Sequence, residues 1–319
     1  MSGLAEETIG PDEAAVVAQF VAFLKAASDK RVPTGPRQRF NQARASACVN
    51  AEFMVLGGLP GEARVGLFAA PRAYRAWIRF ANAASASDRD RDIRGMSIRV
   101  FDVEGPNLTP GANTQDFVLN SHPVMMAADT KGFMELLQAN EAGGLRRALY
   151  FLTHPQALRV GMAARTNPSC HLDLSYWSTT PYLFGPRRAV KYVVRPGSAR
   201  RSPMPPTLTD TYLTDAIRAR LVEADATFDF MIQLQTDSRR MPIEDASVEW
   251  KQQDSPYVPV ARIRIPQQSI DEPGREAQCE QTAFNPWHCL PEHRPLGSMN
   301  RARREIYRAM AAFRAEPRR

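Results

Sequence analysis

The chain has 319 residues, 44% of them hydrophobic and 24% charged, which is typical of a soluble globular protein with a substantial core. Its formal net charge of +7 is moderate, and the sequence carries neither a recognition motif nor interleaved aromatic residues for nucleic acid. No window approaches the roughly 18 apolar residues of a membrane span, and residues 1–7 lack a basic segment leading into an apolar run. We therefore expect a cytoplasmic protein with no nucleic-acid partner and no membrane partner.

The N-terminal part of the chain is predicted to contain both helices and strands. An amphipathic helix is expected within residues 1–30, capped by Asp12, because its apolar side chains recur at helical spacing. The latter half of residues 39–55 alternates between polar and apolar side chains, which predicts a strand. Residues 71–77 are predicted to form a helix that leads into residues 78–82.

The remaining chain is predicted to add further helices and strands. Helices are expected at residues 129–140, 143–162 and 209–223, and strands at residues 190–194, 227–235, 248–250 and 259–265. No internal repeat and no low-complexity linker separates these segments. We therefore expect a single domain over residues 1–319.

Cysteine and histidine residues offer little sign of a metal site. The four cysteines are scattered without zinc-type spacing, at Cys48, Cys170, Cys279 and Cys289. We expect them to be reduced, structural thiols. His288 and His293 lie near the last cysteine, but their spacing does not match a zinc finger and their proline-rich surroundings predict a packed segment.

The segment most informative about chemistry lies near the C-terminus. Residues 284–297 are rich in proline and are predicted to be irregular. A helix is predicted over residues 298–314, and Arg303 and Tyr307 lie four residues apart, on one side of it. A guanidinium beside a phenol favours the phenolate form, which is an anionic ligand suited to ferric haem.

This helix resembles the proximal haem side of the catalase family, because Arg303-x-x-x-Tyr307 follows a Phe-x-Pro segment. The nearest resemblance is to the small, catalase-related bacterial haem proteins. It extends in scattered segments over residues 37–314, in the order that the family requires. The resemblance implies a haem b cofactor with Tyr307 as the axial ligand of the iron.

Three arginines resemble the residues that bind the haem propionates in this family. Arg39 stands at the start of the segment that leads into the first barrel strand, and Arg79 precedes a phenylalanine and a small residue. Arg314 lies seven residues after Tyr307, two helical turns further on. The resemblance implies that these three guanidinium groups neutralise the propionates.

The opposite, distal side departs from the family. Gln42 occupies the position of the distal histidine, and Ala81 stands where a serine usually orients that histidine. A glutamine amide can orient a ligand, but it does not titrate and so cannot shuttle a proton efficiently. Asn120, after a Thr-Gln-Asp-Phe motif, aligns with the distal asparagine that can hydrogen-bond a ligand on iron.

Residues after Asn120 also differ from the family. Met125 and Met126 stand where phenylalanines are usual, so the pocket is expected to be reshaped. His122 lies only two residues beyond Asn120. A relocated acid–base role for His122 stays open, although a structural histidine is the preferred interpretation.

The resemblance implies an α+β fold in which an eight-stranded closed antiparallel barrel is surrounded by helices. The preferred function is a haem peroxidase acting on hydrogen peroxide or an organic hydroperoxide, with weak catalase activity. A haem isomerase or dehydratase that rearranges an O–O or N–O bond, as in allene oxide synthases, stays open. A non-enzymatic role as a haem sensor or carrier also stays open. A homo-oligomeric state stays open as well.

Overall fold

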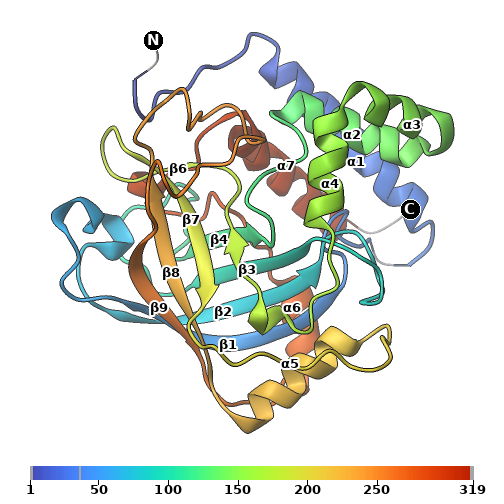
Figure 1. Ribbon diagram of the computed structural model, residues 1–319. Coiled ribbons are helices and arrows are strands. Elements are labelled where there is room, and N and C mark those ends of the chain that lie inside the picture. Colours follow the sequence, from blue (N-terminus) through green and yellow to red (C-terminus); the bar gives the residue numbers. More distant parts are fainter. Residues whose placement is uncertain (1–2, 36, 317–319) are drawn as a thin grey trace.

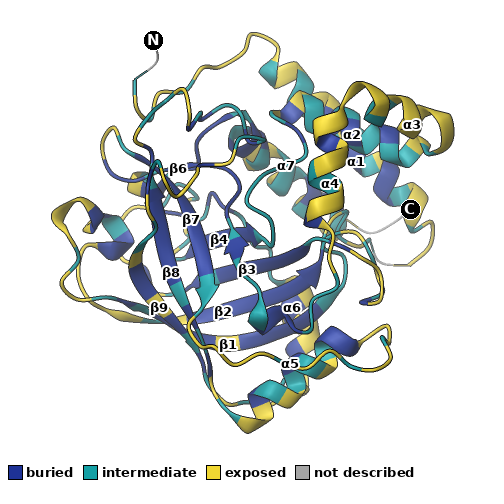
Figure 2. Cartoon of the chain, viewed as in Figure 1, coloured by how far each residue is buried: buried dark blue, intermediate teal, exposed yellow. Residues whose placement is uncertain are grey.

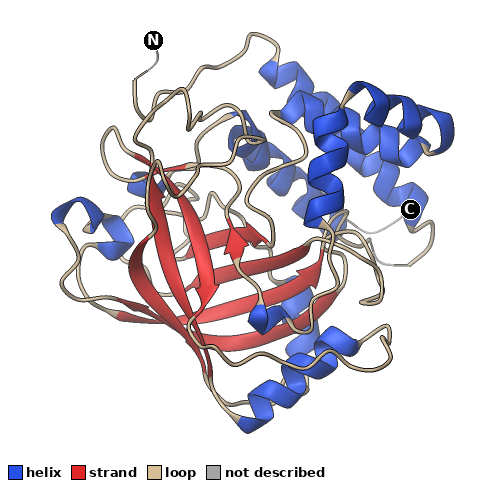
Figure 3. Ribbon diagram, in the orientation of Figure 1, coloured by secondary structure: helices blue, strands red, loops and turns tan. Residues whose placement is uncertain are grey.

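The structure is a computed structural model that describes residues 3–35 and 37–316. This part of the chain folds into nine strands and seven α-helices (Figure 1, Figure 3). The strands are β1 (Ala45–Val55), β2 (Ala73–Asn82), β3 (Arg94–Val100), β4 (Gln115–Asn120), β5 (Tyr176–Trp177), β6 (Tyr182–Leu183), β7 (Ala189–Pro196), β8 (Ala226–Leu234) and β9 (Val258–Ile265). The helices are α1 (Glu13–Arg31), α2 (Thr130–Ala142), α3 (Gly144–Thr153), α4 (Pro155–Ala164), α5 (Tyr212–Glu223), α6 (Arg275–Gln281) and α7 (Ser298–Ala315).

Eight of the strands close into an antiparallel barrel. They pair in the order β5-β4-β3-β2-β1-β9-β8-β7, and β7 pairs again with β5. The short strand β6 adds to β7 as a ninth. Closure gives both sides of each barrel strand a hydrogen-bonded neighbour. The predicted fold class, an eight-stranded closed antiparallel barrel with surrounding helices, is therefore confirmed.

Aromatic side chains fill the inside of the barrel. Phe230 lies 4.7 Å from Phe117 and 5.1 Å from Phe53, measured between ring centroids. Tyr192 lies 4.9 Å from the Phe117 ring. All four rings are fully or almost fully buried. Because these large side chains occupy the centre, the barrel interior is a packed core rather than a ligand cavity.

The outer surface of β2, β3 and β4 faces a group of helices. Successive strand residues point to opposite sides, so Ile78 and Ile98 enter the core while Arg79 and Ser97 point outward. Figure 1 shows α1, α2, α4 and α7 gathered on one side of the barrel. No helix of the described residues is both long and apolar enough to cross a bilayer.

The first and last helices pack together and form a second apolar cluster. Phe20 and Leu24 of α1 contact Met310 and Phe313 of α7 within this cluster. Near the start of α7, Arg301 forms ion pairs with three carboxylates, those of Glu7, Glu13 and Glu244. The N-terminal segment therefore holds the C-terminal helix in place.

Two local predictions were wrong. Residues 73–77 belong to β2 rather than to a helix, because the strand pairs with β1 along one side and β3 along the other. Its core residues Ala76, Ile78 and Phe80 recur every second position, as a strand requires. Residues 248–250 form no strand. The helices predicted at 129–140, 143–162 and 209–223 are confirmed, with a break near His154 and shifted ends.

The expectation that all cysteines are reduced was also wrong. Cys48 of β1 and Cys279 of α6 form a disulfide across a sequence separation of 231 residues. Cys170 and Cys289 are free and buried. The disulfide packs against Trp77 and fixes α6 to the outside of the barrel. The spacing of the four cysteines does not show which two of them pair, so the sequence alone could not identify this bond.

Candidate functional site

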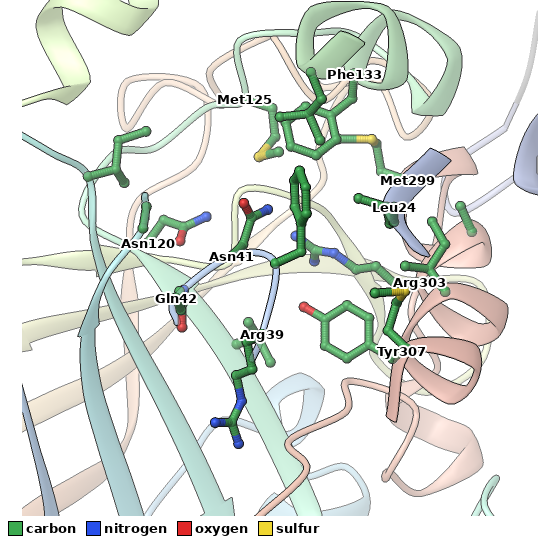
Figure 4. Close-up of a pocket in the computed structure, with 18 of the residues that line it drawn as sticks. Leu24, Arg39, Asn41, Gln42, Asn120, Met125, Phe133, Met299, Arg303 and Tyr307 are labelled. Atoms are coloured by element: carbon green, nitrogen blue, oxygen red, sulfur yellow. The ribbon is translucent and has the colours of Figure 1, made fainter. Parts of the chain in front are cut away.

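A cavity of about 1630 Å³ lies between the outer face of the barrel and the surrounding helices. Its walls come from β2, β3 and β4 on one side and from α1, α2, α4 and α7 on the other. Figure 4 shows side chains from both walls pointing into this space. All seven residues predicted to form the site line it: Arg39, Gln42, Arg79, Asn120, Arg303, Tyr307 and Arg314.

The helix α7 presents Tyr307 and Arg303 to the cavity. In Figure 4 the phenol oxygen of Tyr307 points away from α7, toward the wall that carries Gln42 and Asn120. The guanidinium of Arg303 donates from Nη1 to Thr180 Oγ1 and to Asn300 Oδ1, each at 3.1 Å. These bonds fix the arginine one helical turn from the tyrosine, which agrees with the predicted spacing.

Gln42 lies on the opposite wall in an uncommon backbone conformation. Its φ of 55° places it in the left-handed region, which non-glycine residues rarely adopt. Its N–H donates to Ala83 O at 2.8 Å, and its carbonyl oxygen accepts from Arg79 Nη2 at 2.7 Å. Backbone contacts therefore hold this conformation and direct the side chain into the cavity.

A glycine on β3 makes room for the Gln42 amide. A Cβ at Gly95 would lie 2.3 Å from Gln42 Nε2, so any larger residue would displace the amide. Gly95 pairs with Ala81 on one side and with Asn120 on the other. This register brings Asn120, at the end of β4, onto the wall where the Gln42 amide lies.

The three predicted propionate arginines converge beside α6. Arg39 donates to the Glu280 carboxylate and also to two backbone carbonyls, Glu280 O at 2.8 Å and Thr282 O at 2.9 Å. Arg79 lies 3.3 Å from the Glu280 carboxylate. Burial lowers the pKa of Arg79 to about 10, and the charges of Arg39 and Arg314 contribute. Burial also lowers the pKa of Arg314, and the charge of Arg39 adds to the effect.

This arginine cluster carries more positive charge than its neighbours balance. Arg79 is only 2% exposed, and its Nε has no hydrogen-bond partner among the described residues. Glu280 is the carboxylate that contacts Arg39 and Arg79. Buried guanidinium groups favour anionic partners that accept their hydrogen bonds. The cluster therefore has unbalanced positive charge and an unused donor, which favour a bound anion.

Glu280 is a site residue that the sequence analysis missed. It follows Cys279 directly, so the disulfide to Cys48 holds its helix beside the arginines. Its partners Arg39 and Arg79 lie 241 and 201 residues earlier in the chain. No sequence motif marks a single glutamate whose partners are so distant.

His122 lies in the cavity wall, half-buried. Burial lowers the pKa of His122, while the charge of Glu249 opposes the change. Met125 and Met126 also line the cavity, as the expected reshaping of the pocket requires. The site therefore contains one imidazole whose proton is held less tightly than usual.

The late histidines do not form a metal site with other ligands. His288 Nδ1 lies 3.0 Å from the Asp116 carboxylate, and His293 Nε2 accepts from Leu67 N–H at 3.1 Å. Across residues 3–35 and 37–316, no cluster of three or more His, Cys, Asp or Glu side chains is arranged to hold a metal ion. Both histidines have packing partners instead.

Known proteins resemble this chain in sequence and in fold. No protein-family model matches it. A catalase-related peroxidase from Mycolicibacterium paratuberculosis (strain ATCC BAA-968 / K-10) is 30% identical over 214 residues, which cover 60% of this chain and 62% of that protein. The match thus spans less than two thirds of that relative.

Two solved structures share the architecture. A fungal catalase superimposes with a TM-score of 0.70 and 16% identity, covering 99% of this chain and 66% of that one. Catalase A from Saccharomyces cerevisiae has a TM-score of 0.68 and 17% identity, covering 98% of this chain and 67% of that one. These likenesses show that the chain adopts the catalase barrel fold.

Proposed function

We infer that the protein is a haem-binding oxidoreductase that acts on hydrogen peroxide or on organic hydroperoxides. The observation that carries this proposal is the position of Tyr307, whose phenol oxygen points across the cavity toward Gln42 and Asn120 (Figure 4). The similarity to a catalase-related peroxidase gives independent support.

The residues of the cavity fit haem b. Tyr307 supplies a phenol oxygen, the atom through which a tyrosine binds ferric iron, and Arg303 is fixed one helical turn before it on α7. Arg39, Arg79 and Arg314 supply the positive charge and the free donor that two propionates require. The cavity volume of about 1630 Å³ leaves space beyond the cofactor for a substrate.

Bound haem would supply the redox chemistry that cleaves a peroxide bond. The chain itself binds and orients the peroxide through the Gln42 and Asn120 amides, which both donate and accept hydrogen bonds. Neither amide moves a proton at neutral pH. The His122 imidazole is a titratable base in the same cavity wall. We therefore expect slow dismutation of hydrogen peroxide.

The visible spectrum of the purified, haem-reconstituted protein tests this proposal. We expect a high-spin ferric spectrum that Tyr307→Phe abolishes or alters, because the variant removes the phenol oxygen that would bind the iron. Tyr74→Phe is the matched control, since Tyr74 is half-buried on β2 and lies outside the cavity lining. An unchanged spectrum and haem content in Tyr307→Phe would contradict the axial assignment.

A second candidate function follows from Gln42 alone. Rearrangement of an O–O bond within one substrate needs no proton shuttle of the kind that dismutation requires, so an amide at this position suits an isomerase or dehydratase. Product analysis with an organic hydroperoxide separates the two candidates. Oxidation of an added dye supports the peroxidase, whereas a rearranged product without dye oxidation supports the isomerase.

A further inference from the structure

The helices α3 and α4 carry an exposed apolar surface on the side of the cavity away from the barrel. None of the α3 residues is buried. Leu145, Leu149 and Leu152 are 77%, 51% and 78% exposed and recur at the four- and three-residue spacing of one helix face. On α4, Leu158 and Met162 are 39% and 60% exposed. In Figure 2 both helices are largely yellow, beside the dark blue strands of the barrel.

Positive charge accompanies this surface, and α3 and α4 themselves carry no negative side chain. Residues 142–164 contain Arg146, Arg147 and Arg159 but no aspartate or glutamate. Arg146 and Arg159 each follow an exposed leucine by one position, so they flank the two apolar faces. In the part of the chain that the structure describes, none of these three arginines has an ion-pair partner. The surface is therefore amphipathic and cationic.

The same surface borders the entrance to the cavity. Leu158 and Met162 are exposed to solvent and also line the cavity. Arg147 and Phe151 of α3 reach the cavity as well. A partner that covers the α3–α4 surface would therefore lie at the mouth of the site.

We propose that the α3–α4 surface docks on an anionic lipid bilayer, with the two helices lying on the membrane rather than crossing it. Leucines on one side of a helix enter the boundary between headgroups and acyl chains, and flanking arginines bind anionic headgroups. This proposal reverses the expectation, drawn from composition, that the protein has no membrane partner. It goes beyond the proposed enzymatic function, and docking itself requires no haem.

Charge favours a bilayer over a second copy of the chain. A twofold interface would place this surface against itself and bring Arg146, Arg159 and their copies together. Those unpaired arginines would repel one another in a desolvated interface. An anionic bilayer satisfies the apolar and the cationic parts of the surface at once.

Co-sedimentation with lipid vesicles tests the proposal on the full chain, with and without haem. We expect binding to vesicles of phosphatidylcholine mixed with phosphatidylglycerol, and much weaker binding to phosphatidylcholine alone. Arg146→Ala and Arg159→Ala should each lower the affinity about fivefold, because a juxtamembrane arginine has an effect of that size. Leu149→Glu should lower it by about tenfold or more. Val222→Glu is the matched control, since Val222 is 55% exposed on α5, elsewhere on the molecule.

Fluorescence gives a second readout at a position where substitution disturbs no packing. Leu152→Trp should show a blue-shifted emission with the anionic vesicles, because the indole enters the interface. Equal affinity of Leu149→Glu and the unaltered chain for the anionic vesicles would overturn the proposal. So would the absence of any vesicle binding. A concentration-dependent dimer that Leu149→Glu disrupts, without vesicle binding, would show instead that a second copy covers this surface.

Discussion

The backbone of Gln42 explains how an amide comes to face the cavity. A non-glycine residue at a φ of 55° carries a conformational cost of about 1–3 kcal/mol, which its surroundings must offset. Ala83 and Arg79 do so through the two backbone hydrogen bonds of Gln42. Gly95 adds the space that the side chain occupies. The position is thus arranged to hold one particular side chain against β3, in the wall of the cavity.

Gln42→His tests whether proton transfer limits peroxide dismutation. Histidine tolerates the left-handed backbone better than most residues, so the substitution is compatible with the fold. A positioned base contributes about 10²–10⁴-fold to such steps, and we expect at least about a tenfold rise in oxygen evolution at equal haem occupancy. Gln42→His with Ala81→Ser should exceed the single variant, because a serine can fix the imidazole tautomer.

The matched control is Gln38→His, an exposed position outside the cavity lining. It should leave oxygen evolution unchanged. Fast dismutation by the unaltered protein would contradict the argument and would direct attention to His122, an imidazole already in the cavity wall.

Glu280→Gln tests the charge balance of the arginine cluster. The amide keeps the size of the side chain, and Arg39 keeps its bonds to the backbone oxygens of residues 280 and 282. Arg39 and Arg79 lose their shared carboxylate, so they attract the haem propionates more strongly. We expect haem to transfer to apomyoglobin about two- to fivefold more slowly, the effect of a partly exposed ion pair.

Glu276→Gln, at an exposed position of the same helix, is the control for this experiment. It should not alter the transfer rate. Faster haem loss from Glu280→Gln would mean that the carboxylate positions the arginines rather than competing with the propionates.

At the scale of secondary structure, β7 carries a buried lysine whose titration affects stability. Lys191 Nζ donates to Val248 O at 3.1 Å and lies 5.0 Å from the Trp250 ring centroid. Burial lowers the pKa of Lys191 from 10.5 to about 7. Between these two values the unfolded chain binds a proton that the folded chain does not. The free energy of unfolding should therefore rise as the pH increases from about 7 to about 10.5.

Lys191→Met removes this proton linkage. At pH 7 we expect the variant to raise the free energy of unfolding by about 1–3 kcal/mol, since a flexible apolar side chain replaces a poorly solvated amine. This increase in the free energy of unfolding should become smaller toward alkaline pH, because the lysine of the unfolded chain then also loses its proton. Urea unfolding at two pH values measures both effects. Lys251→Met, at an exposed position, is the control and should leave the free energy of unfolding unchanged. If Lys191→Met is instead less stable than the unaltered protein, the contacts of Lys191 with Val248 and Trp250 stabilise the fold by more than the burial of the amine destabilises it.

Local patterns predicted some elements well and others poorly. The helix α7 has apolar residues at helical spacing, so the sequence alone places Arg303 and Tyr307 on one side of it. In β2 the arginines Arg75 and Arg79 and the short Ala73 and Ala76 obscure the alternation. Pairing with strands on both sides decides its conformation, and no local pattern reports that pairing.

At the scale of the whole molecule, the site is assembled from distant parts of the chain. The walls of the cavity combine residues from 20 to 314, and the contact between α1 and α7 completes one of them. Resemblance in sequence pointed to seven residues that the structure brings to one cavity, because they stand in short motifs. Glu280, Gly95 and the Cys48–Cys279 pair carry no such motif. Their roles depend on tertiary contacts, which only the folded structure reveals.

The Cys48–Cys279 bond also turns most of the chain into a covalent ring. Its two cysteines have a sequence separation of 231, and all the barrel strands after β1 lie between them. An exposed turn with Arg200 and Arg201 lies within that ring, open to trypsin. A single cut there opens the ring but leaves both pieces joined through sulfur.

Limited trypsin digestion should therefore give one band of full size on a denaturing gel without reductant, and two smaller fragments once a thiol is added. Cys279→Ser should release the fragments without reductant. Fragments that separate from the unaltered protein before reduction would contradict the bond. Because the disulfide still joins the two fragments after the cut, both parts of the barrel stay in one covalent molecule. Cleavage of one surface loop therefore need not destroy the protein.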